Sequence, residues 1–269
     1  MGGALEEKIY ELSKEQKDSY YKNGYLVVPK VFSDEESDTI LDRLYRYANK
    51  DFVAILNPDR PEYLIAQIAQ DFSVDYLLGE RVDRIEEAIE TAKIMRGVMK
   101  DGNMVSILET LQGKEVVGLQ SQILFKQAGS PYASQAWEPH QDNSYIKSNG
   151  HYITTNLFLQ DADKENGTLY FYPGSHKEGL FPAEERKSYR EPAGTNPGNI
   201  TQMQLDKYEK VDENFKKGDL LVLHGDCVHG SYPNVSKTRS RPLFSCSYIT
   251  KGEEFVPGAT ARRKVIPLH

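Results

Sequence analysis

The sequence has little cysteine and lacks any long apolar run. Its 269 residues include two cysteines, Cys227 and Cys246, too few for a framework of disulfides. No stretch approaches the roughly 18 consecutive apolar residues that a membrane-spanning helix needs. The charged N-terminal segment MGGALEEKIYELSKEQ also lacks the apolar core of a signal peptide. We therefore expect a cytoplasmic protein, in a compartment that keeps both thiols reduced.

An excess of positive charge is also missing. The chain carries 33 basic and 40 acidic residues, for a formal net charge of −7. Nucleic acids and anionic membranes both favour a basic protein surface. We therefore expect neither a nucleic acid nor a membrane as partner, and a small molecule as substrate instead.

The first part of the chain, residues 1–114, has mainly helical patterns. Ser13 and Gln16 have the spacing of a capping box, and Gly24 is a typical helix stop. The run YLVVPKVF that follows is typical of a short strand. Ser33 with the acidic residues after it then predicts the start of a second helix. These patterns predict a helical support for the rest of the protein.

From residue 115 to 269 the pattern changes to short apolar or alternating runs. Gly, Pro, Asn and Asp separate them, as in a sandwich or barrel of many short strands. The polar stretch of about 177–212 has no clear period and is expected to be an inserted functional loop. We expect one domain over residues 1–269, with a β core supported by the helices.

A candidate metal site begins at His140 and Asp142, in the segment WEPHQDNSY. In an extended chain, residues two apart lie on the same face. Two imidazoles and one carboxylate form the facial triad of non-haem iron oxygenases, which leaves positions on the metal open. Such a pair is expected by chance in a chain with six histidines and 40 acidic residues. The pair alone is therefore weak evidence.

The second imidazole has two candidates in GDLLVLHGDCVHGSYPN, His224 and His229. Being five residues apart, they have opposite strand parity and are not expected to share a face. His229 is favoured because Ser231 and Arg241 follow it. An arginine can bind the distal carboxylate of a co-substrate in a bidentate manner, and Ser231 adds a hydroxyl. Arg239 is the nearby alternative to Arg241.

Four segments together resemble the phytanoyl-CoA dioxygenase family of Fe(II)/2-oxoglutarate oxygenases. They are LSKEQKDSYYKNGYLVVPKVFSDEE, ILFKQAGSPYASQAWEPHQDNSY, DADKENGTLYFYPGSH and KKGDLLVLHGDCVHGSYPNVSKTRSRPLFSCSY. The resemblance implies a double-stranded β-helix, a jelly-roll or cupin-like barrel. It also implies that iron(II) is bound by His140, Asp142 and His229, and that 2-oxoglutarate and O2 are co-substrates.

The resemblance further implies contacts to 2-oxoglutarate at Gln122, Ser231 and Arg241, with Lys93 as the matching lysine of the helical part. Asn156 stands where the family usually has a tryptophan or a similarly large residue, and it would line the co-substrate pocket. Arg241 lies one residue further from the distal histidine than is usual. The candidates for the substrate pocket are Trp137, Tyr145, Arg186 and Arg190; the two arginines could bind an acidic substrate.

The predicted function is hydroxylation of an unactivated C–H bond in a small molecule, with release of succinate and CO2. Desaturation and ring formation are alternative outcomes. Halogenases of this superfamily replace the carboxylate ligand by Ala or Gly, so Asp142 disfavours halogenation. Two other classes use the same residues: a metal- or ligand-binding barrel without turnover, and a zinc hydrolase. The Arg241–Ser231 pair favours the oxygenase, because a binding barrel has no need for a carboxylate clamp.

Overall fold

The chain is seen in a computed structural model that describes residues 9–47, 52–56, 65–68, 93–129, 133, 136–149, 152–182, 202–258 and 263–269. The helices are α1 (Lys14–Asn23), α2 (Asp34–Tyr47), α5 (Gly102–Gln112) and α6 (Gln202–Leu205), with the 3-10 helices η2 (Asp142–Tyr145) and η3 (Ser175–Glu178). The strands are β1 (Tyr25–Val28), β2 (Phe52–Leu56), β3 (Ile65–Ile68), β4 (Val116–Lys126), β5 (Trp137–His140), β6 (Tyr152–Phe158), β7 (Leu169–Phe171), β8 (Val211–Asp212), β9 (Leu220–His224), β10 (His229–Ser231) and β11 (Arg241–Thr250).

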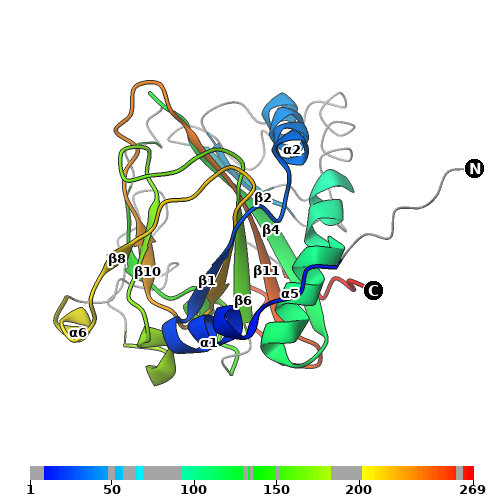
Figure 1. The fold of residues 1–269 in the computed structure, drawn as a ribbon, viewed down its shortest axis with the longest axis vertical. Helices are drawn as coiled ribbons and strands as arrows, with labels where there is room; N and C mark the ends of the chain where they lie inside the picture. Colours follow the sequence, from blue (N-terminus) through cyan, green and yellow to red (C-terminus); the bar gives the residue numbers. More distant parts are fainter. Residues whose placement is uncertain are drawn as a thin grey trace, which may run out of the picture.

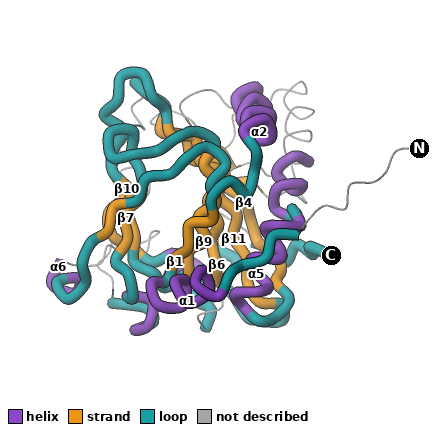
Figure 2. Tube along the Cα trace, in the orientation of Figure 1, coloured by secondary structure: helices purple, strands orange, loops and turns teal. Residues whose placement is uncertain are grey.

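The strands form two antiparallel sheets. The larger has seven strands in the order β1-β9-β6-β11-β4-β2-β3, and the smaller has four in the order β5-β10-β7-β8. The small sheet lies on one side of the molecule, opposite the large sheet, as Figures 1 and 2 show. The prediction of a mainly β, jelly-roll fold is confirmed. The two sheets remain separate, however, and do not close into one barrel within the described part of the chain.

The N-terminal part contributes more than helical support. Helices α2 and α5 lie outside the large sheet, and α1 crosses below it (Figure 1). The described strands β1, β2 and β3 belong to the large sheet itself, with β1 beside β9 and β2 beside β4. The predicted strand after Gly24 is therefore confirmed as β1. Strands β2 and β3 were not predicted.

The start and end of α1 follow the predicted capping residues. The Ser13 hydroxyl accepts a hydrogen bond from the Gln16 backbone N–H (3.2 Å), and the Gln16 side chain accepts one from the Ser13 N–H (2.8 Å). Gly24 ends the helix with φ of 84°, a conformation that favours glycine. The capping box and the glycine stop are both confirmed.

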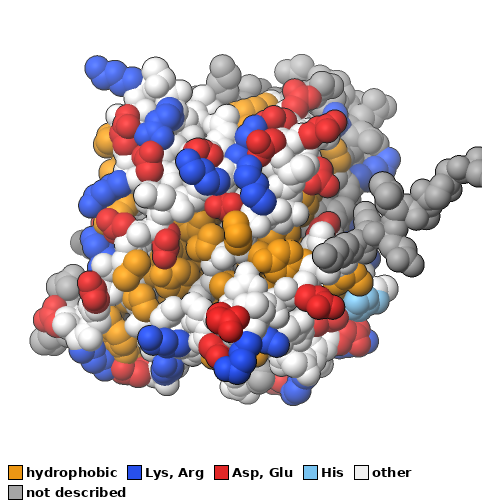
Figure 3. Space-filling model, in the orientation of Figure 1, with side chains coloured by type: hydrophobic (Ala, Val, Ile, Leu, Met, Phe, Trp, Pro, Cys, Tyr) orange, Lys and Arg blue, Asp and Glu red, His pale blue; other side chains and the backbone are white. Residues whose placement is uncertain are grey.

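The two largest apolar clusters of the described residues hold the architecture together. One packs the helices onto the large sheet and includes Leu108 of α5 and Tyr248 of β11. The other lies between the sheets, where Phe158 stacks on Phe215 with ring centroids 3.8 Å apart. Figure 3 shows hydrophobic side chains in the middle of one face, with charged side chains around them. The second cluster fixes the spacing of the sheets, which decides where residues on their inner faces meet.

The two cysteines, Cys227 and Cys246, are both buried free thiols. Within the described residues, no helix combines the length and the hydropathy that crossing a membrane would need.

Gly230, between His229 and Ser231 on β10, has no room for a side chain. A Cβ atom there would lie 2.5 Å from the backbone carbonyl oxygen of Trp137 on the neighbouring strand β5. We expect Gly230→Ala to push the two strands apart and to lower the free energy of unfolding by about 1–3 kcal/mol, the usual effect of overpacking. Chemical denaturation measures this. Gly97→Ala is the control, since nothing lies within 4 Å of a Cβ at that position; an equal loss in both variants would contradict the argument.

Candidate metal centre and co-substrate site

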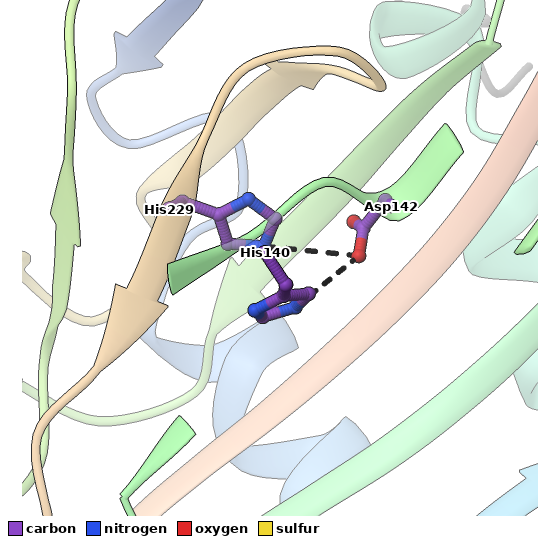
Figure 4. A group of neighbouring side chains, drawn as sticks. All are labelled: His140, Asp142 and His229. Atoms are coloured by element: carbon purple, nitrogen blue, oxygen red, sulfur yellow. Dashed lines mark ion pairs between the residues drawn. The ribbon is translucent and has the colours of Figure 1, made fainter. Parts of the chain in front are cut away.

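Three potential metal ligands from different elements meet between the sheets. His140 ends β5, Asp142 begins η2, and His229 begins β10 directly opposite His140 in the strand register. The Asp142 Oδ1 atom lies 3.6 Å from His140 Nε2 and 3.8 Å from His229 Nε2 (Figure 4). Two atoms that bind one metal at about 2.1 Å can be at most about 4.2 Å apart. Both spacings therefore fit a shared ion.

The segment around His140 and Asp142 is only partly the strand that the sequence predicts. Gln141 is extended, with φ of −121° and ψ of 125°, so residues 140 and 142 do share a side; the chain then turns into η2. The Gln141 amide donates to the backbone carbonyls of Gly179 and Asp226, each at 2.7 Å. Gln141 thus holds the turn that aims both ligands, a positioning role that the sequence reasoning missed.

Both imidazoles are set for metal binding by their backbone contacts. The Nδ1 atom of His140 lies 2.8 Å from the carbonyl oxygen of Glu138, and Nδ1 of His229 lies 3.0 Å from that of Cys227. A carbonyl oxygen can only accept, so each Nδ1 carries the hydrogen. Each Nε2 then presents its lone pair towards Asp142. This orientation through a backbone carbonyl is typical of metal-binding histidines.

The charges of the ligands also suit a divalent cation. Burial lowers the pKa of His229 to about 4, so that imidazole is neutral at neutral pH. Burial acts to raise the pKa of Asp142, but His229, His140 and the hydroxyl of Thr154 together hold it well below its usual range. The site therefore offers one carboxylate and two imidazole nitrogens as donors. This donor set fits iron(II) and leaves coordination positions open.

Thr154 on β6 fixes the carboxylate from behind, since its hydroxyl donates to Asp142 Oδ2 at 3.0 Å. We expect Thr154→Val, which keeps the shape and removes the bond, to weaken iron affinity by about 10- to 100-fold, as is usual for partners of metal ligands. Iron titration monitored by metal analysis tests this. Thr155→Val is the control, because that hydroxyl faces the other way, 3.6 Å from Met104 Sδ. Equal losses in the two variants would argue against the role of Thr154.

His224, the alternative ligand, lies elsewhere. It ends β9 in the large sheet, with its ring centroid 5.1 Å from that of His176 and 6.4 Å from that of Tyr20. Among the described residues, the one group of His, Cys, Asp or Glu that could hold a metal is His140, Asp142 and His229. This group contains His229 and not His224, in agreement with the preference for His229 as the second imidazole.

Arg241 and Ser231, the two residues predicted to bind the distal carboxylate of the co-substrate, are both buried and both adjoin Lys126. Arg241 is 2% exposed, and its Nε donates to the carbonyl of Gly167 at 3.1 Å. Ser231, 5% exposed, follows His229 by two residues and accepts a hydrogen bond from Lys126 at 2.8 Å. Arg239 points outward instead, to Asp163 and Glu165.

Gln122 and Asn156 lie in one row of the large sheet, on the two sides of Ser245. Asn156 is buried and Gln122 is half-buried. Side chains directly across a sheet project from the same face, so the two predicted contacts share a face with Ser245.

The remaining candidates differ in position. The Trp137 ring centroid lies 6.0 Å from that of His140, and Tyr145 is half-buried at the end of η2, three residues after Asp142. Lys93 is exposed, the opposite of what a buried co-substrate contact requires. We therefore leave it out of the proposed site. Arg186 and Arg190 lie outside the described residues, as does much of the predicted insertion 177–212.

Lys126 is the residue near this site that the sequence reasoning overlooked. It is fully buried at the end of β4. A signal was present: Lys126 is four residues after Gln122, so both face the same side of one strand. A fully buried lysine is unusual.

Comparison with known proteins agrees with this geometry. The family model described as "Phytanoyl-CoA dioxygenase (PhyH)" matches residues 20–242. The chain belongs to the phytanoyl-CoA dioxygenase family. Among curated relatives, "Phytanoyl-CoA dioxygenase 1" of Oryza sativa subsp. japonica is 28% identical over 279 residues, covering 95% of this chain and 96% of the relative.

Solved structures with this fold include proteins with a metal and 2-oxoglutarate (alpha ketoglutarate) bound. The epimerase SnoN, in complex with Fe3+, alpha ketoglutarate and nogalamycin RO, superposes with a TM-score of 0.63 at 20% identity, covering 91% of this chain and 86% of the other. HygX from Streptomyces hygroscopicus, with nickel and 2-oxoglutarate bound, has a TM-score of 0.60 at 14% identity, covering 90% and 88%. At these identities the likeness shows the fold. The fit to iron rests instead on the metal-binding residues of this phytanoyl-CoA dioxygenase family member, His140, Asp142 and His229.

Proposed function

We propose that the protein is an Fe(II)- and 2-oxoglutarate-dependent dioxygenase that hydroxylates an unactivated C–H bond of a small molecule and releases succinate and CO2. The observation that carries this proposal is the meeting of two features. Both imidazole Nε2 atoms of the triad are aimed at one carboxylate, and the buried Ser231, two residues after His229, is bonded to Lys126, the register partner of the buried Arg241. A five-carbon 2-oxo diacid could chelate the metal through its 2-oxo acid group and place its distal carboxylate at Arg241 and Ser231.

Strand β10 supplies the spacing between these features. His229 and Ser231 are two residues apart on one face of the strand, which corresponds to roughly 6–7 Å along its axis. The guanidinium of Arg241 is held at Nε by Gly167, so its fork keeps a fixed plane for a carboxylate. Gln122 and Asn156 would line the rest of the co-substrate site. Co-substrate and metal would thus bind in one orientation.

Iron supplies the activation of O2 and the oxidising chemistry when it is bound. The chain's own residues bind the metal and the co-substrate, orient them, and exclude water from the site. Asp142 remains charged and is kept in place by Thr154, and His140 and His229 are both buried away from bulk water. A carboxylate ligand at this position favours hydroxylation over halogenation. Since the same fold carries an epimerase and a carbocyclase, the outcome depends on where the substrate lies, and desaturation or ring formation are alternative outcomes.

Several finer features belong to this proposal. We take residues 1–269 as one oxygenase domain, an organisation supported by the N-terminal strands within the same large sheet. Trp137 and Tyr145, both close to the metal ligands, are proposed to face the substrate. An acidic small molecule as substrate and a cytoplasmic location remain predictions from the sequence.

The experiment uses protein loaded with iron(II) under anaerobic conditions. Adding 2-oxoglutarate should produce the weak visible charge-transfer band of an iron–2-oxoglutarate chelate, and admitting oxygen should produce succinate. A substrate screen by succinate release and product mass then identifies the hydroxylated compound. Absence of the band together with absence of succinate would refute the proposal. Ester hydrolysis by zinc-loaded protein, lost in Asp142→Ala, would instead support the hydrolase.

A further inference from the structure

A fully buried lysine stands directly opposite a buried arginine. Lys126 is the last residue of β4 and Arg241 the first of β11, and the two are partners in the antiparallel register. Their exposed fractions are 0% and 2%. Residues directly opposite in a sheet have Cβ atoms about 4.5–5.5 Å apart, and like charges in such a pair are unfavourable. The pair therefore needs an explanation.

Two hydrogen bonds and the space beside Gly167 fix the position of the Lys126 side chain. The Nζ atom donates to Ser231 Oγ at 2.8 Å and to the backbone carbonyl of Tyr232. Gly167 makes room for the stem, because a Cβ there would lie 2.9 Å from Lys126 Cδ. The same glycine offers its carbonyl to Arg241. One glycine thus contacts both cations.

The two polar partners of Lys126 are neutral. Among the described residues, no carboxylate lies within 4.0 Å of its Nζ atom. Burial, and then the charge of Arg241, hold the pKa of Lys126 well below its usual range. A buried cation without an anionic partner is unfavourable. An anion bound between Lys126 and Arg241 would remove that penalty.

Ser231 shows how such an anion would be received. Its hydroxyl has one hydrogen, and its oxygen already accepts from Lys126. The hydroxyl hydrogen is therefore directed away from Lys126, as a donor for another acceptor. A carboxylate beside Ser231 would accept this hydrogen and lie near both cations.

We propose that Lys126 is a second cationic binding residue for the distal carboxylate of the co-substrate, and that with Arg241 it selects a dicarboxylic over a monocarboxylic 2-oxo acid. This inference rests on the proposed function. Lys126 acts through its charge and by turning the Ser231 hydroxyl towards the carboxylate.

The test compares two co-substrates in two proteins. Iron(II)-loaded wild type and Lys126→Met are titrated anaerobically, by the charge-transfer band, with 2-oxoglutarate and with 2-oxopentanoate, which has the same carbon chain but no distal carboxylate. We expect the Kd for 2-oxoglutarate to rise about 30-fold or more in the variant, as when one partner of a buried charge pair is removed. The Kd for 2-oxopentanoate should change less than about threefold.

The possible outcomes separate the alternatives. Equal weakening of both co-substrates would mean a merely structural lysine, and an unchanged Kd for 2-oxoglutarate would also overturn the inference. If wild type shows no band with either acid, the proposed function itself fails. Lys126→Gln repeats the test should the methionine variant not fold. Lys164→Met is the control, because that lysine is exposed and pairs with Asp212; it should bind both acids like wild type.

A second readout is the pH dependence of binding. The groups facing Lys126 are Arg241 from β11, Ser231 from β10, and the backbone carbonyl of Tyr232, the residue after β10. An anion raises the pKa of Lys126, so binding 2-oxoglutarate takes up a proton and the affinity falls as pH rises between the two pKa values. In Lys126→Met this slope should disappear. An equal slope in both proteins would count against the inference.

Discussion

His229→Ala is expected to abolish stoichiometric iron binding and to lower succinate formation by more than about 100-fold, the upper end for residues that merely support metal ligands. His229 is the second imidazole of the site, with its Nε2 atom 3.8 Å from Asp142 Oδ1. Its loss leaves one imidazole and one carboxylate, too few for a facial triad. Metal analysis after desalting and the charge-transfer band with 2-oxoglutarate measure the two effects.

The matched control for His229 is His224, the candidate five residues earlier. Its Nδ1 atom accepts from the Asp226 backbone N–H at 3.1 Å, and it belongs to the other sheet. We expect His224→Gln to retain one iron per chain and the wild-type band. If His224→Gln lost iron and His229→Ala kept it, the assignment of the triad would be wrong.

The second large effect is expected for Arg241→Met. It removes the guanidinium proposed to bind the distal carboxylate and leaves that carboxylate with a weaker partner in a buried place. Truncating one side of a buried, hydrogen-bonded charge pair costs about 2–5 kcal/mol, or roughly 30-fold to several thousand-fold in Kd. The Kd for 2-oxoglutarate should rise by this factor, while iron binding in its absence stays as in wild type.

Arg239→Met is the control for Arg241. Arg239 is 41% exposed and pairs with Asp163 at 2.7 Å and Glu165 at 2.7 Å, at the surface. Exposed ion pairs contribute little, so its Kd for 2-oxoglutarate should stay within about threefold of wild type. A larger effect from Arg239 than from Arg241 would reverse the choice between the two arginines.

The features that the sequence determined by itself are local. The capping box of Ser13 and Gln16 and the stop at Gly24 depend on contacts within a few residues, and they appear as expected. The expectation that His140 and Asp142 lie on the same side is also met, because Gln141 between them is extended. The turn that begins at Asp142 was missed, since it depends on bonds from Gln141 to Gly179 and Asp226, far along the chain.

The features that only the tertiary structure decided depend on strand register. His229 pairs with His140, and Arg241 pairs with Lys126, across separations that no local pattern encodes. Register is set by which faces the two sheets bury against each other. The motifs could therefore predict the ligands His140, Asp142 and His229. The buried pair of Lys126 and Arg241 became visible only when β4 and β11 were placed side by side.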